Sequence, residues 1–342
     1  MSFINIRKIP SPEEVVEMTP LPKHLKKIKK QRDNELIDIF KGNSDKLILI
    51  IGPCSADDED SVCDYVTRLA KINEKVKDTL FIVPRIYTGK PRTTGAGYKG
   101  MLHQPDPEKA PNILEGILSI RKMNIRAISE TYLTAADEML YPYNLPFVSD
   151  LLTYIAIGAR SVENQQHRLT ASGIDVPVGM KNPTSGDLTV MFNSILAAQS
   201  SHDFIYNGYE VKTSGNPYVH GILRGSVNKH GDNVPNYHYE DLTRASDMYA
   251  KGNYQNPALI IDTNHSNSKK CFYEQPRIVK EVMHNRKYNK TLKNIIKGFM
   301  IESYIVEGNQ KIDEHIYGKS ITDPCLGWEA TEELIYYIAE RI

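Results

Sequence analysis

The sequence has few of the residues that mark disulfide-stapled, zinc-knuckle or nucleic-acid-binding proteins. Only four cysteines occur in 342 residues (Cys54, Cys63, Cys271 and Cys325), and no two of them form a CxxC pair. This excludes a disulfide scaffold and a thioredoxin-like motif, and it favours a reducing compartment. The 42 basic and 42 acidic residues cancel, so the positive surplus that a general nucleic-acid binder needs is absent.

Long apolar segments are missing as well. No run approaches the roughly 18 consecutive apolar residues of a membrane-spanning helix. The first residues, MSFINIRKIPSPEE, are charged and lack the apolar stretch of a signal peptide. Hydrophobic residues still make up 40% of the chain, which is enough for a full globular core. We therefore predict a cytoplasmic protein with neither a membrane nor a nucleic-acid partner.

From residue 46 onward, short apolar runs alternate with stretches of helical spacing. Runs this apolar are typical of strands that are buried on both faces of a parallel sheet. About eight or nine such strands predict an α/β fold, a (β/α)8 TIM barrel with a small inserted strand pair, and a doubly wound open sheet is the alternative. The runs lie at 47–52, 80–87, 126–130, 154–160, 176–182, 219–225, 258–263 and 298–303, with a weaker one at 202–207.

Most of these runs end in a polar or reactive residue. Barrel enzymes draw their chemistry from the carboxyl ends of many strands, whereas an open sheet concentrates it in one or two crevices. The spread of reactive endings therefore favours the barrel. The endings are Cys54, Arg85, Glu130, Arg160, Lys181, Arg224, His265 and Glu302.

The first 45 residues are rich in Pro and Lys and differ from the rest. We expect a short helix at 33–42 that ends at Gly42, and the basic run at 23–30 is most simply a solvated helix face. The chain is thus predicted to comprise an N-terminal extension at 1–45 and a catalytic barrel at 46–342. The extension has few apolar residues of its own, so we expect it to pack on a barrel and to make oligomer or regulatory contacts.

Four strand or loop endings offer metal ligands of mixed chemistry. A thiolate, an imidazole and two carboxylates suit a divalent transition metal such as Mn, Fe, Co or Zn, and not Ca²⁺, which takes oxygen ligands. Each residue alone has a simpler interpretation as a core cysteine or a loop hydrogen-bonding group. Only the four residues together indicate a metal site, and they come together only if the chain forms the barrel. The four are Cys54, His265, Glu302 and Asp323.

Six cationic side chains lie in or beside the apolar runs, where an unpaired charge is costly. A structural ion pair would explain any single one of them. The whole set is better explained by anionic substrates, because guanidinium groups match carboxylate and phosphate with a two-pronged fork. The set is Arg85, Lys90, Arg92, Arg160, Lys181 and Arg224.

Long, ordered motifs in this chain resemble the class I 3-deoxy-D-arabino-heptulosonate 7-phosphate (DAHP) synthases of the enterobacterial feedback-controlled type. The resemblance covers roughly residues 35–342 and implies a (β/α)8 barrel with a short N-terminal extension. The motifs are GPCSADDED (52–60), KPRTT (90–94), GARSVENQQHR (158–168), VGMKN (178–182), ILRG (222–225), DTNHSNSKK (262–270), IESYIVEGNQ (301–310) and YGKSITDPCLGWE (317–329).

The resemblance implies a reaction, a cofactor and partners. The reaction is a metal-dependent, aldol-like condensation of phosphoenolpyruvate with erythrose 4-phosphate and water, which gives DAHP and phosphate as the first step of the shikimate pathway. One divalent ion is implied, with Mn favoured, held by the four ligands named above. The resemblance also implies an aromatic amino-acid effector and a homodimer or homotetramer.

The same resemblance assigns roles to individual residues. The implied phosphoenolpyruvate ligands are Arg85, Lys90, Arg160, Lys181 and Arg224. The implied erythrose 4-phosphate ligands are Lys90, Arg92, Thr93, Thr94 and Asp323. The implied catalytic residues are Cys54, Lys90, Lys181, His265 and Glu130, with Glu130 near the attacking water.

Two segments depart from the family pattern. The loop at 95–100 is one residue longer than usual, and the segment at 203–218 is several residues shorter than in feedback-inhibited members. The second segment and the N-terminal extension build the family's effector site. We therefore expect weak or altered feedback inhibition, with catalysis intact.

Two other functions compete with this interpretation. A sister synthase acts on arabinose 5-phosphate, but it typically carries an Asn-Arg-Ser-type motif where this chain has Pro91-Arg92-Thr93-Thr94. A barrel that serves only as a binding or regulatory subunit would have lost a metal ligand or Lys90, and all of these are present. Both comparisons favour an active synthase that uses erythrose 4-phosphate.

Overall fold

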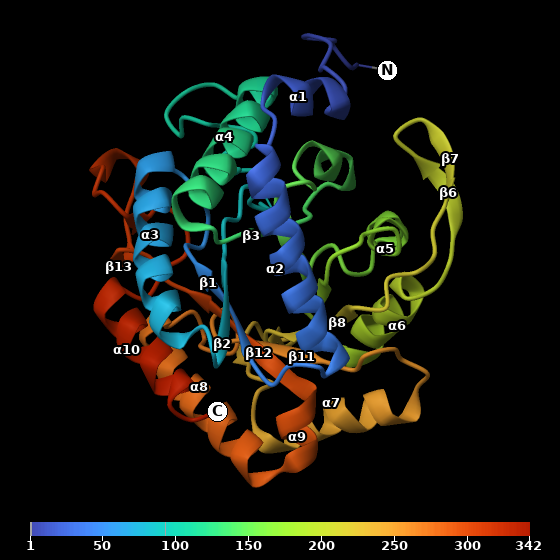
Figure 1. The fold of residues 1–342 in the computed structure, drawn as a ribbon, viewed down its shortest axis with the longest axis vertical. Coiled ribbons are helices and arrows are strands. Elements are labelled where there is room, and N and C mark those ends of the chain that lie inside the picture. The colour runs from blue at the N-terminus through green and yellow to red at the C-terminus, as the bar shows by residue number, and fades with distance from the viewer. Residues whose placement is uncertain (1, 93) are drawn as a thin grey trace.

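Eight parallel strands form the centre of the molecule (Figure 1). The computed structural model describes residues 2–92 and 94–342, so the expected ligand Thr93 lies outside the described residues. The strands pair in the order β2-β1-β12-β11-β8-β5-β4-β3. They are β1 (Leu47–Gly52), β2 (Leu80–Pro84), β3 (Ala135–Glu138), β4 (Leu152–Ile157), β5 (Val178–Lys181), β8 (Val219–Leu223), β11 (Leu259–Asp262) and β12 (Ile296–Glu302).

The two outer strands of this order meet, and their contact closes the barrel. A parallel bridge joins Arg85, just after β2, to Ala136 in β3, and Ile86 N donates to Ala136 O at 2.9 Å. Every residue of β1 is buried, as expected for a strand covered on both faces. The predicted (β/α)8 barrel is confirmed.

Helices surround the barrel and connect its strands (Figure 1). Side-chain caps begin several of them: Asp58 accepts from Ser61 N in front of α3, and Asp187 accepts from Thr189 N in front of α6. The helices are α3 (Glu59–Val76), α4 (Ile113–Thr131), α5 (Gln165–Ala171), α6 (Leu188–Ala198), α7 (Tyr239–Lys251), α8 (Gln275–Tyr288), α9 (Lys290–Ile295) and α10 (Trp328–Ala339). Short 3-10 turns lie at η1 (Pro142–Phe147), η2 (Phe272–Glu274) and η3 (Ile312–Glu314).

The expected strand at 126–130 is wrong. These residues form the end of α4, whose buried side chains recur at helical spacing along one face, and Tyr132 in the left-handed conformation ends the helix. The strand in this part of the barrel is β3, which has four residues, two of them alanine. A short strand with small side chains gave too weak an apolar signal beside the long apolar face of α4.

Three small strand pairs lie outside the barrel. The weak run at 202–207 supplies β6 (Asp203–Tyr206), which pairs antiparallel with β7 (Tyr209–Lys212). This hairpin is the predicted inserted strand pair, and it projects away from the barrel in Figure 1. The other pairs are β9 (Ser226–Val227) with β10 (Asn233–Val234) and β13 (Val306–Asn309) with β14 (Lys319–Ser320).

The N-terminal segment forms α1 (Pro12–Met18) and α2 (Lys23–Lys41). The expected helix at 33–42 is the second half of α2, which ends at Lys41 with Gly42 at a φ of 79°. Arg32 donates to Ile82 O and covers the Phe81 ring, while Phe40 packs on His220 with ring centroids 4.4 Å apart. α2 therefore covers the end of the barrel where its strands begin.

No helix within the described residues is long and apolar enough to cross a membrane.

One buried arginine ties the N-terminal segment to the barrel helices. Arg121, on α4, has a fully buried side chain and binds both carboxylate oxygens of Asp150 at 2.6 and 3.0 Å. It also donates to Thr19 Oγ1, Thr19 O and Phe147 O at 2.7 to 2.8 Å. Thr19 is the C-cap residue of α1, so one guanidinium joins the end of α1, helix α4 and the segment that follows η1.

We expect Arg121→Met to lower the free energy of unfolding by roughly 3–5 kcal/mol, because it leaves a carboxylate and two carbonyls without their partner. Arg126→Met, on the same helix, is the control. Arg126 binds Glu59, Asp60 and Glu130 at the surface, and we expect a loss below about 1 kcal/mol. Denaturant unfolding measures both. Equal losses would mean that Arg121 is not the anchor.

Candidate active site

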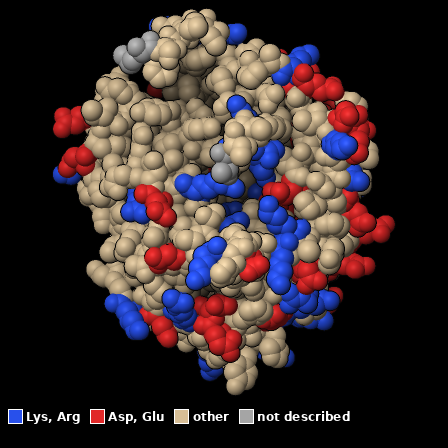
Figure 2. All heavy atoms as spheres, turned by 180° about the vertical axis from the view of Figure 1, so that it is seen from behind, with Lys and Arg blue, Asp and Glu red and all other residues tan. Residues whose placement is uncertain are grey.

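One pocket at the carboxyl ends of the strands collects most of the residues that the sequence singled out. The expected residues that line it are Cys54, Arg85, Lys90, Arg92, Arg160, Lys181, Arg224, His265 and Asp323. Lys and Arg side chains also gather around the middle of the face seen in Figure 2, whereas Asp and Glu lie mainly nearer its margin. Because the net charge of the chain is zero, this concentration of positive charge is local.

Three of the four expected metal ligands form a tight cluster. Cys54 follows β1, Glu302 ends β12, and Asp323 lies after β14. One ligand atom from each of these residues lies within 4.8 Å of the others. A thiolate with two carboxylates is a donor set for a borderline divalent transition metal. The residues present therefore fit the ion that the sequence predicts.

The fourth expected ligand, His265, lies beside this cluster. Its Nδ1 is 2.9 Å from Asp262 Oδ2, and its Nε2 is 3.7 Å from Glu302 Oε1. A carboxylate on one ring nitrogen fixes the orientation of the ring and leaves the other nitrogen for a metal, as in many metal sites. Asp262 thus has a role that the sequence reasoning missed, although it begins the DTNHSNSKK motif.

Lys90 shows that this cluster attracts positive charge. Its Nζ lies 2.6 Å from Cys54 Sγ and 3.0 Å from Asp323 Oδ2. Burial alone would raise the pKa of Asp323, but Lys90 and His265 hold it below its usual range. Burial and Glu302 raise the pKa of the Cys54 thiol, against the opposing effect of Lys90. A bound metal ion would deprotonate such a thiol outright.

A buried ion pair joins the metal cluster to an arginine that lines the pocket. Arg85 Nη2 lies 2.9 Å from Glu302 Oε1, and their side chains are 2% and 1% exposed. Arg85 also donates to Pro53 O and lies 3.7 Å from the centre of the Tyr87 ring. Asn264 binds the other carboxylate oxygen of Glu302. Both oxygens of Glu302 are therefore fixed in position.

Further cationic side chains line the pocket, and one of them has an unused hydrogen-bond donor. Lys181, at the end of β5, is held by Asp262 Oδ2 at 2.9 Å. Arg224 is buried after β8, and its Nη1 finds no hydrogen-bond partner within the described part of the chain. Arg160 and Lys270 line the same pocket. A buried guanidinium with an unused donor suits a phosphate or carboxylate ligand.

The structure does not place Glu130 in this pocket. Glu130 lies near the end of α4 and pairs with Arg126 at 2.9 Å. The glutamate that lines the pocket is Glu138, the last residue of β3. A Cβ atom on Gly158 would lie 2.3 Å from Glu138 Oε1, so the glycine makes room for this carboxylate. Sequence reasoning missed Glu138 because it missed the strand that carries it.

The loop between β2 and α4 carries the remaining expected ligands. Lys90 N donates to Lys99 O at 3.0 Å, and Arg92 Nε donates to Tyr98 O at 2.8 Å. These contacts fold the loop back on itself and keep Lys90 and Arg92 at the pocket. Thr94 is exposed and is not one of the described residues that line the pocket.

The sequence profile of the DAHP synthetase I family matches residues 22–335. The chain belongs to this family. It is therefore an enzyme of the DAHP synthase type, and the family resemblance read from its motifs is confirmed.

Individual relatives of this family member match over nearly their whole length. The Phe-sensitive phospho-2-dehydro-3-deoxyheptonate aldolase of Escherichia coli (strain K12) is 36% identical over 346 residues, which is 98% of this chain and 95% of that protein. The phospho-2-dehydro-3-deoxyheptonate aldolase of Haemophilus influenzae is 34% identical over 340 residues, which is 97% of this chain and 91% of that protein. The structure of the Francisella tularensis enzyme superimposes with a TM-score of 0.92 at 30% identity, covering 100% of this chain and 98% of that one.

Metal binding by this DAHP synthetase I family member is testable without an activity assay. We expect Cys54→Ala to lose stoichiometric Mn²⁺ or Zn²⁺, because it removes the one thiolate of the cluster. Cys63→Ala is the matched control, since Cys63 is equally buried but contacts Met123 O on α4. Elemental analysis of dialysed protein gives the metal content. Metal retained in the Cys54 variant would place the ion elsewhere.

Proposed function

We propose that the chain condenses phosphoenolpyruvate with erythrose 4-phosphate and water to give DAHP and phosphate, and that it requires one divalent transition metal. The observation that carries this proposal is one pocket that is lined both by Cys54 and Asp323, two members of the Cys54–Glu302–Asp323 cluster, and by the cations Lys181 and Arg224. Substrates with two phosphates and a carboxylate match such a pocket. The names of the relatives point to the same product.

In this proposal, the cations of the pocket bind and orient the two substrates. The proposed phosphoenolpyruvate ligands are Arg85, Lys90, Arg160, Lys181 and Arg224. Lys90 also binds the tetrose phosphate, together with Arg92. Cys54, His265, Glu302 and Asp323 would hold the divalent ion, which when bound would act as a Lewis acid on the aldehyde oxygen. Holding two reactants in attack geometry is worth roughly 7–11 kcal/mol of barrier in favourable cases.

The side chains around carbon 2 of phosphoenolpyruvate handle water and protons. Carbon 3 attacks the aldehyde carbon, positive charge develops at carbon 2, and water adds there before phosphate leaves by C–O cleavage. We assign the water-orienting role first expected of Glu130 to Glu138, because Glu138 lines the pocket. Lys181 is the proposed proton carrier, and Asp262 holds its ammonium group at 2.9 Å.

The proposed reaction is tested by phosphate release from the two substrates. We expect a chelator to abolish activity and Mn²⁺, added back alone, to restore it. We also expect kcat/KM to be far higher with erythrose 4-phosphate than with arabinose 5-phosphate. Full activity in metal-free enzyme would exclude the metal requirement, and equal or higher activity with the pentose would exclude the substrate assignment.

The corrected carboxylate assignment has a test of its own. We expect Glu138→Gln to lower kcat by about 100-fold or more, since general acid–base groups contribute at least that much. Glu130→Gln should leave kcat within about twofold, because Glu130 lies outside the pocket and pairs with Arg126 at the surface. The reverse result would restore Glu130 to the mechanism.

A second cavity supports an effector role for an aromatic amino acid. It has a volume of about 840 Å³ and lies between α2, η1 and the β6–β7 hairpin. Phe204 and Val211 give it apolar lining, and Lys30, Asp33 and Asp175 give it charges of both signs. Relatives in Escherichia coli are named Phe-sensitive and Trp-sensitive. We expect weak or altered inhibition because the hairpin segment is short, and micromolar inhibition by any aromatic amino acid would contradict this.

The N-terminal residues support assembly into a homodimer or homotetramer. Phe3, Ile4 and Ile6 are 86–88% exposed, which is unusual for three large apolar side chains so close together. We infer that they pack on a second copy of the chain. A monomer in light scattering at micromolar concentration would contradict this inference.

A further inference from the structure

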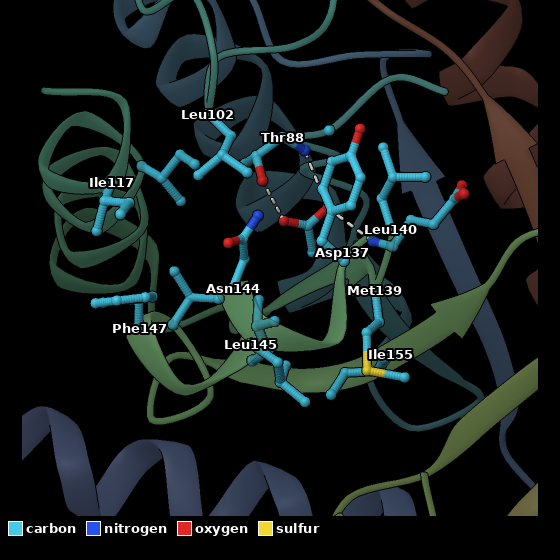
Figure 3. A pocket seen from close by; sticks show the side chains of 16 residues that line it. Thr88, Leu102, Ile117, Asp137, Met139, Leu140, Asn144, Leu145, Phe147 and Ile155 are labelled. Carbon is cyan, nitrogen blue, oxygen red and sulfur yellow. Dashed lines mark hydrogen bonds between the residues drawn. The ribbon is translucent and has the colours of Figure 1, made fainter. Parts of the chain in front are cut away.

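A buried carboxylate that the proposed reaction does not use lies next to Glu138. Asp137 is 5% exposed and accepts three hydrogen bonds. The donors are Thr88 N at 2.9 Å, Thr88 Oγ1 at 2.5 Å and Glu138 N at 2.7 Å. Figure 3 shows the Asp137 carboxylate directed at Thr88, with dashed lines for the hydrogen bonds between the two residues.

Thr88 is the point at which part of the β2–α4 loop returns to itself. Its carbonyl accepts from Leu102 N at 3.2 Å, so the chain that leaves the barrel after Thr88 is bound to Thr88 again at Leu102. Gly100 approaches so closely that a Cβ atom there would lie 2.3 Å from Thr88 O, and its φ of +95° also requires glycine. Whatever holds Thr88 therefore holds the loop that carries Lys90 and Arg92.

The surroundings make the contact between Asp137 and Thr88 strong and hard to replace. A cavity of about 40 Å³ lies beside it, and Ile117, Leu145 and Phe147 line that cavity (Figure 3). Burial raises the pKa of Asp137 to about 7 in spite of its three hydrogen bonds. Hydrogen bonds are stronger in such a low-dielectric setting, and donors left without a partner there are costly.

We propose that Asp137 is a positioning residue that fixes the 89–101 loop, with Lys90 and Arg92, to strand β3 and so to Glu138. The catalytic meaning of this contact rests on the proposed function, because Lys90 and Arg92 are the proposed ligands of the tetrose phosphate and Glu138 is the proposed water-orienting group. The contact between Asp137 and Thr88 links Glu138 to the loop that carries Lys90 and Arg92. Asp137 itself is not among the residues that line the candidate active site.

The variants are chosen to separate this role from general stability. Asp137→Asn keeps the shape: its oxygen still accepts from both N–H groups, and its amide donates to Thr88 Oγ1. Asp137→Leu has a similar volume and no polar atom. Alanine is unsuitable, because water would enter from the adjacent cavity and bridge the two N–H groups. Ile117→Ala enlarges the same cavity without touching Thr88 and is the control for lost stability.

Two milder variants change Thr88, the partner of Asp137 in this contact. Thr88→Val removes the hydroxyl donor and keeps the branched shape, whereas Thr88→Ser keeps the hydroxyl. If Asp137→Leu fails to fold, the Val and Ser variants carry the same test.

The first measurement is amide hydrogen exchange in metal-loaded protein. We expect exchange in residues 89–101 to be roughly tenfold faster or more in Asp137→Leu and Thr88→Val, because local opening no longer breaks hydrogen bonds to the carboxylate. The Asn, Ser and Ile117→Ala variants should exchange in this loop as the unchanged protein does. Unchanged loop exchange in both Asp137→Leu and Thr88→Val, or equal acceleration in Ile117→Ala, would overturn the proposal.

The second measurement is steady-state kinetics. We expect Asp137→Leu to raise KM for erythrose 4-phosphate by roughly tenfold and KM for phosphoenolpyruvate by a much smaller factor, with rescue in Asp137→Asn. The reason is that Lys90 is the one proposed phosphoenolpyruvate ligand on this loop, and the other four lie elsewhere. Equal rises in both KM values would overturn the positioning role. If the unchanged protein makes no DAHP but the loop exchange behaves as expected, the proposed function fails while the structural role of Asp137 stands.

Discussion

Closure of the parallel barrel is the constraint on which the site depends. It brings the carboxyl ends of all eight strands to one mouth, so charged residues that are distant in sequence become buried neighbours. Buried charges are tolerated only when they are paired. The barrel meets this requirement with Arg85 against Glu302 and Lys181 against Asp262, at 2.9 Å in each case. Each pair also fixes a group that the proposed chemistry uses.

The ion pairs leave some buried hydrogen-bond donors unused, and these donors determine what the pocket can bind. Arg85 Nε and Arg224 Nη1 are buried without a hydrogen-bond partner among the described residues. Beside Arg85, the residues Cys54, Glu302 and Asp323 concentrate negative charge around one point, where Lys90 contacts two of them. The site thus combines donors for an anion with a donor set for a metal ion, which is what the proposed function requires.

The sequence predicted the barrel well because buried strands such as β1, with the sequence LILIIG, are continuous apolar runs. It failed at β3, where four residues with two alanines gave less signal than the apolar face of α4. That error moved the expected carboxylate from Glu138 to Glu130. Asp262 was missed for a different reason, since a residue that orients others through hydrogen bonds has no pattern in one sequence. The sequence predicted a solvated helix face for the basic run at 23–30, which does form the first half of α2, but it did not show that Leu25 within this run is buried.

The most direct test of this account is a crystal structure with Mn²⁺ and phosphoenolpyruvate bound. We predict an anomalous peak for the ion between Cys54 Sγ and the carboxylates of Glu302 and Asp323, with His265 Nε2 turned toward it. The phosphate of the substrate should contact Arg160, Lys181 and Arg224. An ion bound away from Cys54, or a phosphate held by Lys90 and Arg92 instead, would contradict the assignment of the two halves of the pocket.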